Sequence, residues 1–205
     1  MDFPNSVPGD TVGFVSEEKY KGVRTYGDPV LRRPGERIAA VTDEIRALAD
    51  RMVRIMREAH GVGLAAPQIG VSKSICVIEI PAEYDRDEKG LALNPGIVMP
   101  WVLINPVITT YSRRTDVCEE GCLSFPGISA PIRRAREIAI TYTELDGRAC
   151  ALTVKEYLAR AVQHEIDHLN GVLLADRMTV ASKVTLARAL REIKAETQTE
   201  LGLLS

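Results

Sequence analysis

The sequence predicts an α+β fold on the basis of three observations. Short runs rich in β-branched and apolar residues, typical of strands, recur along the chain between positions 74 and 154. An Asp-Gly pair at 146–147 lies between two of these runs, a position typical of the tight turn of an antiparallel hairpin. Three helical patterns flank the runs without the regular alternation of strand and helix that a parallel sheet requires. The fold class expected is therefore α+β rather than a doubly wound sheet.

The first helix is expected over residues 43–60, after an N-terminal arm. Residues 1–22 are rich in Pro, Gly and polar side chains without a sustained period, and an extended arm is expected there. Apolar residues then recur at intervals of three and four up to position 59, the pattern of an amphipathic helix. Thr42 or Asp43 is expected as its N-cap, and Gly61 lies just beyond its end.

The remaining elements follow in order along the chain. Residues 61–70 are small and bounded by glycine, so a loop or irregular edge is expected there, and residues 81–100 are expected to form a surface loop. The runs expected to be strands are residues 74–80, 101–110, 137–145 and 150–154. The later helices are expected over residues 155–169, which Asn170 and Gly171 would end, and over residues 182–197.

Composition limits the class of protein. The chain has 205 residues, of which 45% are apolar and 26% charged, as in a globular domain rather than a fibrous or disordered chain. Its 26 basic and 28 acidic residues give a net charge of −2, which argues against sequence-independent binding to nucleic acid. No apolar run approaches the about 20 residues of a membrane-spanning helix. The N-terminus lacks the basic and apolar regions of a secretory signal, so a cytoplasmic protein is expected.

The strongest chemical signal is the pattern H-E-x-x-H at residues 164–168. Side chains four residues apart lie on one face of a helix, so His164 and His168 can bind a single metal ion. Glu165 is then the adjacent carboxylate, able to take a proton from water on the metal. The helix is apolar before the motif, which favours a position of the two imidazoles toward the interior.

A catalytic metal needs a third protein ligand. The extended zinc-peptidase pattern would place a third histidine at position 174, where the chain has Leu174, so that pattern is excluded. Glu192 or Glu196 in the last helix stays open as a ligand, although a solvated helix face is the simpler interpretation of both. Cys122 is the other candidate, because Gly121 before it would let the backbone approach a metal closely.

The other three cysteines carry less information. Cys118 lies four residues before Cys122 and could pair or compete with it. Cys76 and Cys150 fall in or beside predicted strands and are interpreted as small buried side chains. Four cysteines are too few for a disulfide scaffold in a chain of this length.

The glycine-rich stretch at 61–70 offers a third candidate site. Its glycines can expose backbone N–H and C=O groups to an extended ligand, and Gln68 offers an amide N–H that could stabilise an oxyanion. No Gly-Lys-Ser/Thr follows, so the stretch is not a phosphate-binding loop.

Taken together, three segments resemble the signature motifs of the peptide deformylases, in the family's order along the chain. They are G-V-G-L-A-A-P-Q at 61–68, E-G-C-L-S at 120–124 and Q-H-E-I-D-H at 163–168. The resemblance extends to residues 26–32 and 103–106.

The resemblance implies an α+β fold in which antiparallel sheets pack around a central metal-binding H-E-x-x-H helix, with a C-terminal helix. It implies three parts of the chain: an extended arm at 1–22, a catalytic domain at 23–178, and a C-terminal helix and tail at 179–205.

The resemblance also implies a role for each residue that matches a motif. The implied metal ligands are Cys122, His164 and His168, with water in the fourth position. The implied catalytic groups are Glu165, as base and then acid, and Gln68 with the backbone N–H of Leu123, as oxyanion hole. The backbone groups implied to pair with an extended peptide substrate are those of Val62, Gly63 and Gly121.

The implied activity is hydrolysis of the formyl group from the N-terminal formyl-methionine of newly made polypeptides, with release of formate. The implied cofactor is one divalent metal ion, Fe(II) in the cell, with Zn, Ni or Co able to occupy the site. Nascent polypeptides are the expected partners, and neither a membrane nor DNA is expected. Contact of the C-terminal helix with the ribosome has little support, because basic and acidic residues nearly balance from residue 176 onward.

The chain departs from the family pattern in a few places, which include the arm at 1–22 and the loop at 81–100, and two rival functions remain. Many relatives carry an arginine shortly after E-G-C-L-S, where this chain has Ser129 and Ala130, which puts peptide affinity in question. One rival is a zinc endopeptidase with a third ligand in the last helix, which would keep its activity without Cys122. The other is a deformylase-like binding protein that holds metal without turnover.

Overall fold

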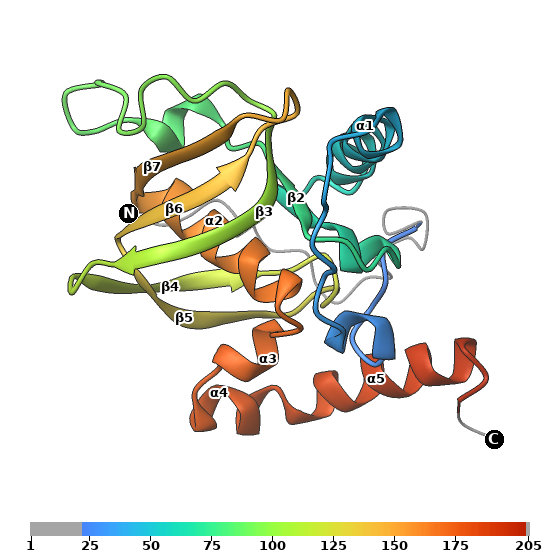
Figure 1. The fold of residues 1–205 in the computed structure, drawn as a ribbon. Helices are drawn as coiled ribbons and strands as arrows, with labels where there is room; N and C mark the ends of the chain where they lie inside the picture. The colour runs from blue at the N-terminus through green and yellow to red at the C-terminus, as the bar shows by residue number, and fades with distance from the viewer. Residues whose placement is uncertain (1–21, 204–205) are drawn as a thin grey trace.

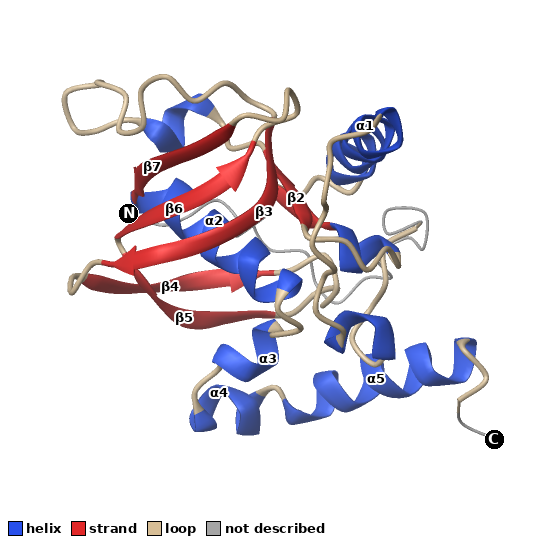
Figure 2. Cartoon of the chain, viewed as in Figure 1, coloured by secondary structure: helices blue, strands red, loops and turns tan. Residues whose placement is uncertain are grey.

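A computed structural model describes residues 22–203, which form two antiparallel sheets and the helices packed against them (Figures 1 and 2). All but the last residue of the arm expected at 1–22 lies outside the described residues. The larger sheet has five strands in the order β1-β2-β3-β6-β7. Its strands are β1 (Gly63–Ala65), β2 (Ile75–Ile78), β3 (Trp101–Tyr111), β6 (Glu137–Thr143) and β7 (Ala149–Lys155). The smaller sheet is a hairpin of β4 (Thr115–Gly121) and β5 (Ser129–Ala135).

The α-helices are α1 (Asp43–Glu58), α2 (Glu156–Leu169), α3 (Leu174–Arg177), α4 (Val180–Thr185) and α5 (Ala187–Glu200). Short 3-10 helices are η2 (Pro29–Arg32), η3 (Ala66–Ile69) and η4 (Ala82–Asp85). The predictions of an α+β class, of antiparallel sheets and of a C-terminal helix are confirmed. None of the helices among the described residues combines the length and the apolar character that crossing a membrane requires.

Helix α1 begins where the sequence predicted, and the structure decides between the two candidate caps. Thr42 is the N-cap, and its side chain accepts a hydrogen bond from the backbone N–H of Ile45 (3.4 Å). The buried face of the helix, which includes Ala49, Met52 and Met56, packs against Ile75 of β2 and other apolar residues of the sheet.

Helices α1 and α2 pack on opposite faces of the larger sheet. Successive side chains of a strand point to opposite faces. In β2, Ile75 and Val77 belong to the apolar cluster of α1, whereas Cys76 and Ile78 belong to the cluster that contains Val162 and Ile166 of α2. All four residues of β2 are therefore buried. Burial on both faces explains the uninterrupted apolar run that predicted this strand.

Helix α2 is buried over most of its circumference, which is unusual for a helix with this many charged residues. Its buried side chains include Arg160, Glu165 and Asp167 besides the apolar ones. The helix contacts strands of both sheets, so it lies where the two sheets meet. Asn170 caps its end and Gly171 follows in the left-handed conformation, as predicted.

The structure corrects the expected elements in three places. The stretch at 61–70, expected to be a loop, contains β1 and η3. Strands β4 and β5 had no strand prediction, because charged residues and, in β5, Pro131 interrupt their apolar pattern. The single helix expected over 182–197 is divided into α4 and α5 at Leu186.

The C-terminal helix packs on the beginning of the described chain. Leu190 and Ile193 of α5 contact the apolar cluster that contains Leu31 and Phe125, and the hydroxyls of Thr25 and Thr197 lie 2.6 Å apart. Figure 1 shows α5 running beside the N-terminal segment and η2.

We expect Gly171→Ala to destabilise the fold more than Gly147→Ala. Both glycines have positive φ angles, +70° and +90°, so alanine costs about 1 kcal/mol at either position. At Gly171 the added methyl group would also meet the backbone carbonyl of Arg32, whereas at Gly147 it would meet open space. Urea unfolding of both variants measures the difference. Equal losses of unfolding free energy in the two variants would mean that the contact with Arg32 imposes no constraint on position 171.

Candidate metal centre

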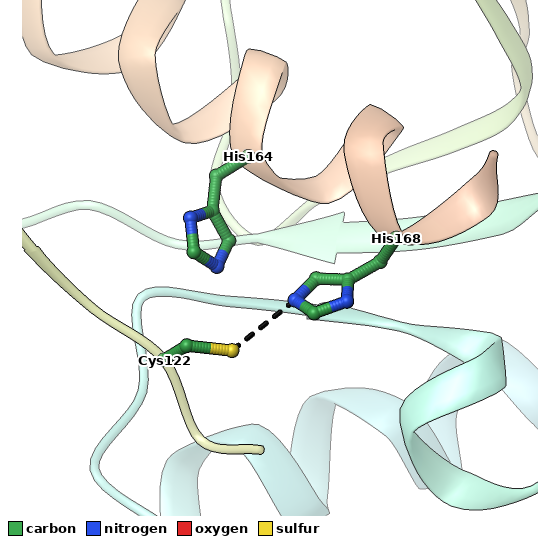
Figure 3. Close-up of side chains that lie close together, drawn as sticks. All are labelled: Cys122, His164 and His168. Atoms are coloured by element: carbon green, nitrogen blue, oxygen red, sulfur yellow. Dashed lines mark hydrogen bonds between the residues drawn. The ribbon is translucent and has the colours of Figure 1, made fainter. Parts of the chain in front are cut away.

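Cys122, His164 and His168 lie together on adjoining elements. Cys122 follows the end of β4, and both histidines project from α2, four residues apart. One ligand atom from each side chain lies within 4.8 Å of the other two, and Cys122 Sγ is 3.2 Å from His168 Nε2. Figure 3 shows the sulfur and the two imidazole rings converging on one point.

This donor set fits a divalent metal ion. Ligand atoms at metal bond lengths of about 2.0–2.3 Å in a tetrahedral site lie about 3.5 Å from one another, close to the separations seen here. One thiolate and two imidazoles suit Zn and Fe(II) better than Mg or Ca, which prefer oxygen. His168 is almost fully buried, and burial lowers its pKa, which favours the neutral imidazole that a metal requires.

Glu120 orients the first histidine of the cluster. Its carboxylate oxygen Oε2 lies 3.0 Å from His164 Nδ1. Burial alone would raise the pKa of Glu120, but hydrogen bonds from His164 and Arg134 lower it well below its usual range. An ionised carboxylate only accepts hydrogen bonds, so Nδ1 donates and Nε2 is left for a metal. The sequence patterns predicted no role for Glu120, although it is the first residue of E-G-C-L-S.

A buried network of ion pairs holds Glu120 in turn. Arg134 of β5 donates to both of its carboxylate oxygens (3.0 and 2.9 Å), and Arg160 of α2 donates to Oε1 (2.6 Å). Arg134 also binds Asp167 of α2 (2.6 Å), so it joins two carboxylates. No local pattern pointed to this network, because its members are separated by up to 47 positions in the chain.

Glu165 lies in a buried position beside β1. Burial raises its pKa to about 7, and one carboxylate oxygen, Oε2, has no hydrogen-bond partner among the described residues. A methyl group on Gly63 would overlap this carboxylate. Glycine at position 63 therefore provides the space that Glu165 occupies.

Gln68 is fixed by its own helical turn. Its Oε1 accepts a hydrogen bond from the backbone N–H of Ala65 (2.8 Å), which orients the amide so that Nε2 faces the cluster. Nε2 lies 3.2 Å from Ser124 Oγ and 3.7 Å from Cys122 Sγ. Leu123 lies between Cys122 and Ser124 in the chain. Because Cys122 also contacts His168, the three motif segments meet at one place.

One edge of β1 pairs with no other strand of its sheet among the described residues. β1 is the outer strand of its sheet. The carbonyl of Val62 accepts a hydrogen bond from the N–H of Glu79 on the inner side. Because backbone groups alternate between the two edges of an antiparallel strand, those of Gly63 point to the outer edge. Gly121 ends β4, next to Cys122.

Several candidates from the sequence lie outside the cluster. Cys118 is not part of it, and its thiol donates a hydrogen bond to Asp116 Oδ2 (3.8 Å). Glu192 and Glu196 are exposed on α5, where Glu192 pairs with Arg188 (2.7 Å). Within residues 22–203 the group that could hold a metal ion is thus completed by a cysteine and not by a carboxylate of the last helix.

Comparison with known proteins identifies close relatives. Residues 20–184 match the family model described as polypeptide deformylase. The chain is 44% identical over 170 residues to peptide deformylase 2 of Gloeobacter violaceus, covering 83% of this chain and 84% of that protein.

Solved structures give the same result. The Plasmodium falciparum peptide deformylase is 34% identical, with a TM-score of 0.76 over 86% of this chain and 97% of that one. A Synechococcus elongatus peptide deformylase in complex with actinonin is 36% identical, with a TM-score of 0.71 over 83% and 84% of the two chains.

We expect Glu120→Gln to destabilise the protein by about 3 kcal/mol, because it removes a buried negative charge from two guanidinium groups and an imidazole. Glu192→Gln, which breaks an exposed ion pair, should cost less than about 1 kcal/mol. Urea unfolding of the metal-free proteins measures both. If Glu120→Gln lost as little free energy of unfolding as Glu192→Gln, this result would contradict a structural role for the buried charge.

Proposed function

The chain belongs to the polypeptide deformylase family and removes the formyl group from the N-terminal methionine of nascent polypeptides, and we propose that it does so at Cys122, His164 and His168. The reaction hydrolyses an amide and releases formate. The observation that carries the proposal is the convergence of one thiol, at the end of β4, and two imidazoles, on the buried helix α2, beside a buried carboxylate.

The enzyme uses a divalent metal ion, and we propose Fe(II) in the cell, with Zn, Ni or Co able to replace it. Cys122, His164 and His168 would hold the ion, and α2 would be the central metal-binding helix. When bound, the metal supplies Lewis-acid chemistry, polarising the formyl carbonyl and lowering the pKa of water. Glu120 keeps the His164 ring in the tautomer that this ligand role needs.

Glu165 is proposed to move the proton. As water attacks the formyl carbon, a C–O bond forms and Glu165 Oε2 takes the proton of the water. Glu165 then gives this proton to the amide nitrogen as the C–N bond breaks, so that formate and a free N-terminus leave. The unpartnered Oε2 and the water-excluding surroundings support this role.

Gln68 and Leu123 are proposed to stabilise the oxyanion that forms on the formyl oxygen. Gln68 Nε2 faces the cluster because Oε1 is held by Ala65. The backbone N–H of Leu123 follows Cys122 directly and would be the second donor. A donor of this kind contributes about 10²–10³ in rate.

The substrate backbone is proposed to lie along Val62, Gly63 and Gly121. The outward-facing groups of Gly63 could extend the larger sheet by one strand, as in other cases where a peptide adds to a sheet edge. Ser129 and Ala130 occupy the stretch where many relatives carry an arginine. Without that arginine, hydrogen bonds to the substrate backbone would provide most of the peptide affinity.

Nascent polypeptides are the substrates of this family, and we propose that the enzyme works in the cytoplasm, where these chains are made. Residues 23–178 would form the catalytic domain. Ribosome contact through α5 stays a weaker proposal, because the charges in this part of the chain nearly balance.

The decisive experiment measures formate release from formyl-Met-Ala-Ser under anaerobic conditions, with metal content determined on the same sample. Wild-type protein with about one metal per chain should release formate from this peptide and none from the acetyl analogue. Glu165→Gln should keep the metal and lose nearly all turnover, by a factor of about 10² or more, while the exposed Glu192→Gln should match wild type.

Three outcomes would contradict parts of this proposal. Substantial turnover by Glu165→Gln would remove its role as base. Metal-loaded wild-type protein without formate release would favour a binding protein. Cleavage of internal peptide bonds would favour an endopeptidase.

Cys122→Ser should weaken metal binding and change the preferred metal, because a hydroxyl is a harder and poorer ligand than a thiolate. Cys118→Ser is the matched control, since that cysteine lies four residues earlier and outside the cluster. Metal content after dialysis against a chelator, followed by competition between Zn and Co, measures the difference. Unchanged occupancy in Cys122→Ser would exclude it as a ligand.

A further inference from the structure

A cavity of about 300 Å³ lies away from the metal cluster, at the other end of the β4–β5 hairpin. Cys122 follows the last residue of β4, whereas the cavity is lined by its first residue, Thr115, about 20 Å along the strand. Helix α2 contributes Gln163 and Asp167 to the lining, and the three cluster residues contribute nothing. The cavity is thus separate from the candidate metal centre.

Positive charge dominates the lining of this cavity. Three arginines, Arg133, Arg134 and Arg177, line it together with one acidic residue, Asp167. Arg134 and Arg177 both bind Asp167, so this one carboxylate is already shared between two cations. Arg133 forms no ion pair within residues 22–203 and donates only to Thr115 Oγ1 (3.2 Å).

Unused hydrogen-bond donors remain in the cavity after these contacts. A guanidinium group has five N–H donors. Arg177 uses its Nε and Nη2 toward Asp167, and Arg133 uses only Nη1. Tyr111, Ser112 and Thr115 also line the cavity, although the Ser112 hydroxyl already donates to the Arg114 carbonyl (2.8 Å). The cavity therefore offers many donors and one acceptor group that is already paired.

The positive surface continues beyond the cavity. Arg113 and Arg114, in the turn between β3 and β4, are exposed and form no ion pair within the part of the chain that the structure describes. A smaller cavity of about 110 Å³ shares Ser112 with the first and is lined by Arg114 and Arg136 among others. Glu156 pairs with Arg136 there and Glu137 with Lys155, so Arg114 is the unpaired cation that the smaller cavity adds to this positive surface.

We propose that the larger cavity binds a small organic phosphate monoester. A monoester carries a charge of about −1.5 to −2 at neutral pH, which would be neutralised by the unpaired Arg133 of the cavity and the unpaired Arg113 and Arg114 beside it. Its terminal oxygens suit guanidinium and hydroxyl donors. The cavity volume is at the lower limit of small-molecule sites, about 300 Å³, so there is room for an organic group as well as a phosphate. The half-exposed ring of Tyr111 offers that group a flat apolar face.

An ion-pair network that only stabilises the fold would not account for all the arginines that line the cavity. Arg134 is fully used in holding Glu120 and Asp167, and a structural role accounts for it. That role does not account for Arg133, which is exposed on β5 and contributes no charge to the network. Arg133 is therefore the residue whose removal separates the two interpretations.

The test is calorimetric titration of the metal-loaded protein with adenosine 5′-monophosphate, with inorganic phosphate, and with adenosine as a probe without phosphate. The monophosphate should bind at one site per chain, inorganic phosphate more weakly, and adenosine not measurably. Arg133→Gln should weaken monophosphate binding by about tenfold or more, the effect of losing a charge-assisted contact. Arg133→Lys keeps the charge without the planar guanidinium group, and its affinity for the monophosphate should lie between those of wild type and Arg133→Gln.

Arg54→Gln is the matched control, because Arg54 is an exposed arginine on α1, an element that does not line the cavity. It should bind the monophosphate as wild type does. Formate release should be unchanged in every one of these variants, which shows that each is folded and keeps its metal.

Three results would overturn the proposal. They are no binding of the monophosphate at millimolar concentration, equal binding by wild type and Arg133→Gln, and equal binding of the monophosphate and its methyl diester. The second result would place the phosphate elsewhere, including at the metal, and the third would indicate a nucleic-acid backbone rather than a small monoester.

Discussion

The hydrogen bonds made by the buried Glu120 carboxylate determine how the parts of the candidate site fit together. This one side chain, on β4, is bound by Arg134 from β5 and by Arg160 and His164 from α2. Because Cys122 follows Glu120 by two residues, the contact that fixes Glu120 against α2 also brings the cysteine sulfur to the histidines. The hairpin and the helix are held in one register by charge rather than by apolar packing alone.

Burying these charged groups costs free energy, which makes their position beside the candidate metal centre informative. Removing several ionised groups from water carries a desolvation penalty that their attraction only partly offsets, so apolar side chains of similar size would stabilise the same interface as well or better. Ion pairs define directions that apolar contacts do not. An imidazole that must present one particular nitrogen needs such a direction, and Glu120 gives it to His164.

The opposite wall of the site depends on small residues and on backbone. Gly63 leaves the space that Glu165 fills, and the N–H of Ala65 holds the amide of Gln68. The residues between 61 and 70 are therefore small for two reasons: side chains from elsewhere need the room, and the backbone itself makes the contacts. A segment whose apolar residues follow neither the helical nor the strand period can thus form a short edge strand followed by a turn of 3-10 helix.

The sequence by itself determined those features that depend on neighbours in the chain. The apolar period of α1, the buried run of β2, the Asp-Gly turn and the two histidines four residues apart are local patterns, and the structure confirms each. The three motifs in order were enough to indicate the family. The tertiary structure alone decided that β4 and β5 pair although they carry charges, that Glu120 lies behind His164, and that three arginines surround a cavity. The physical reason is that a charged side chain is buried only where partners from distant segments neutralise it, and no local pattern records which segments those are.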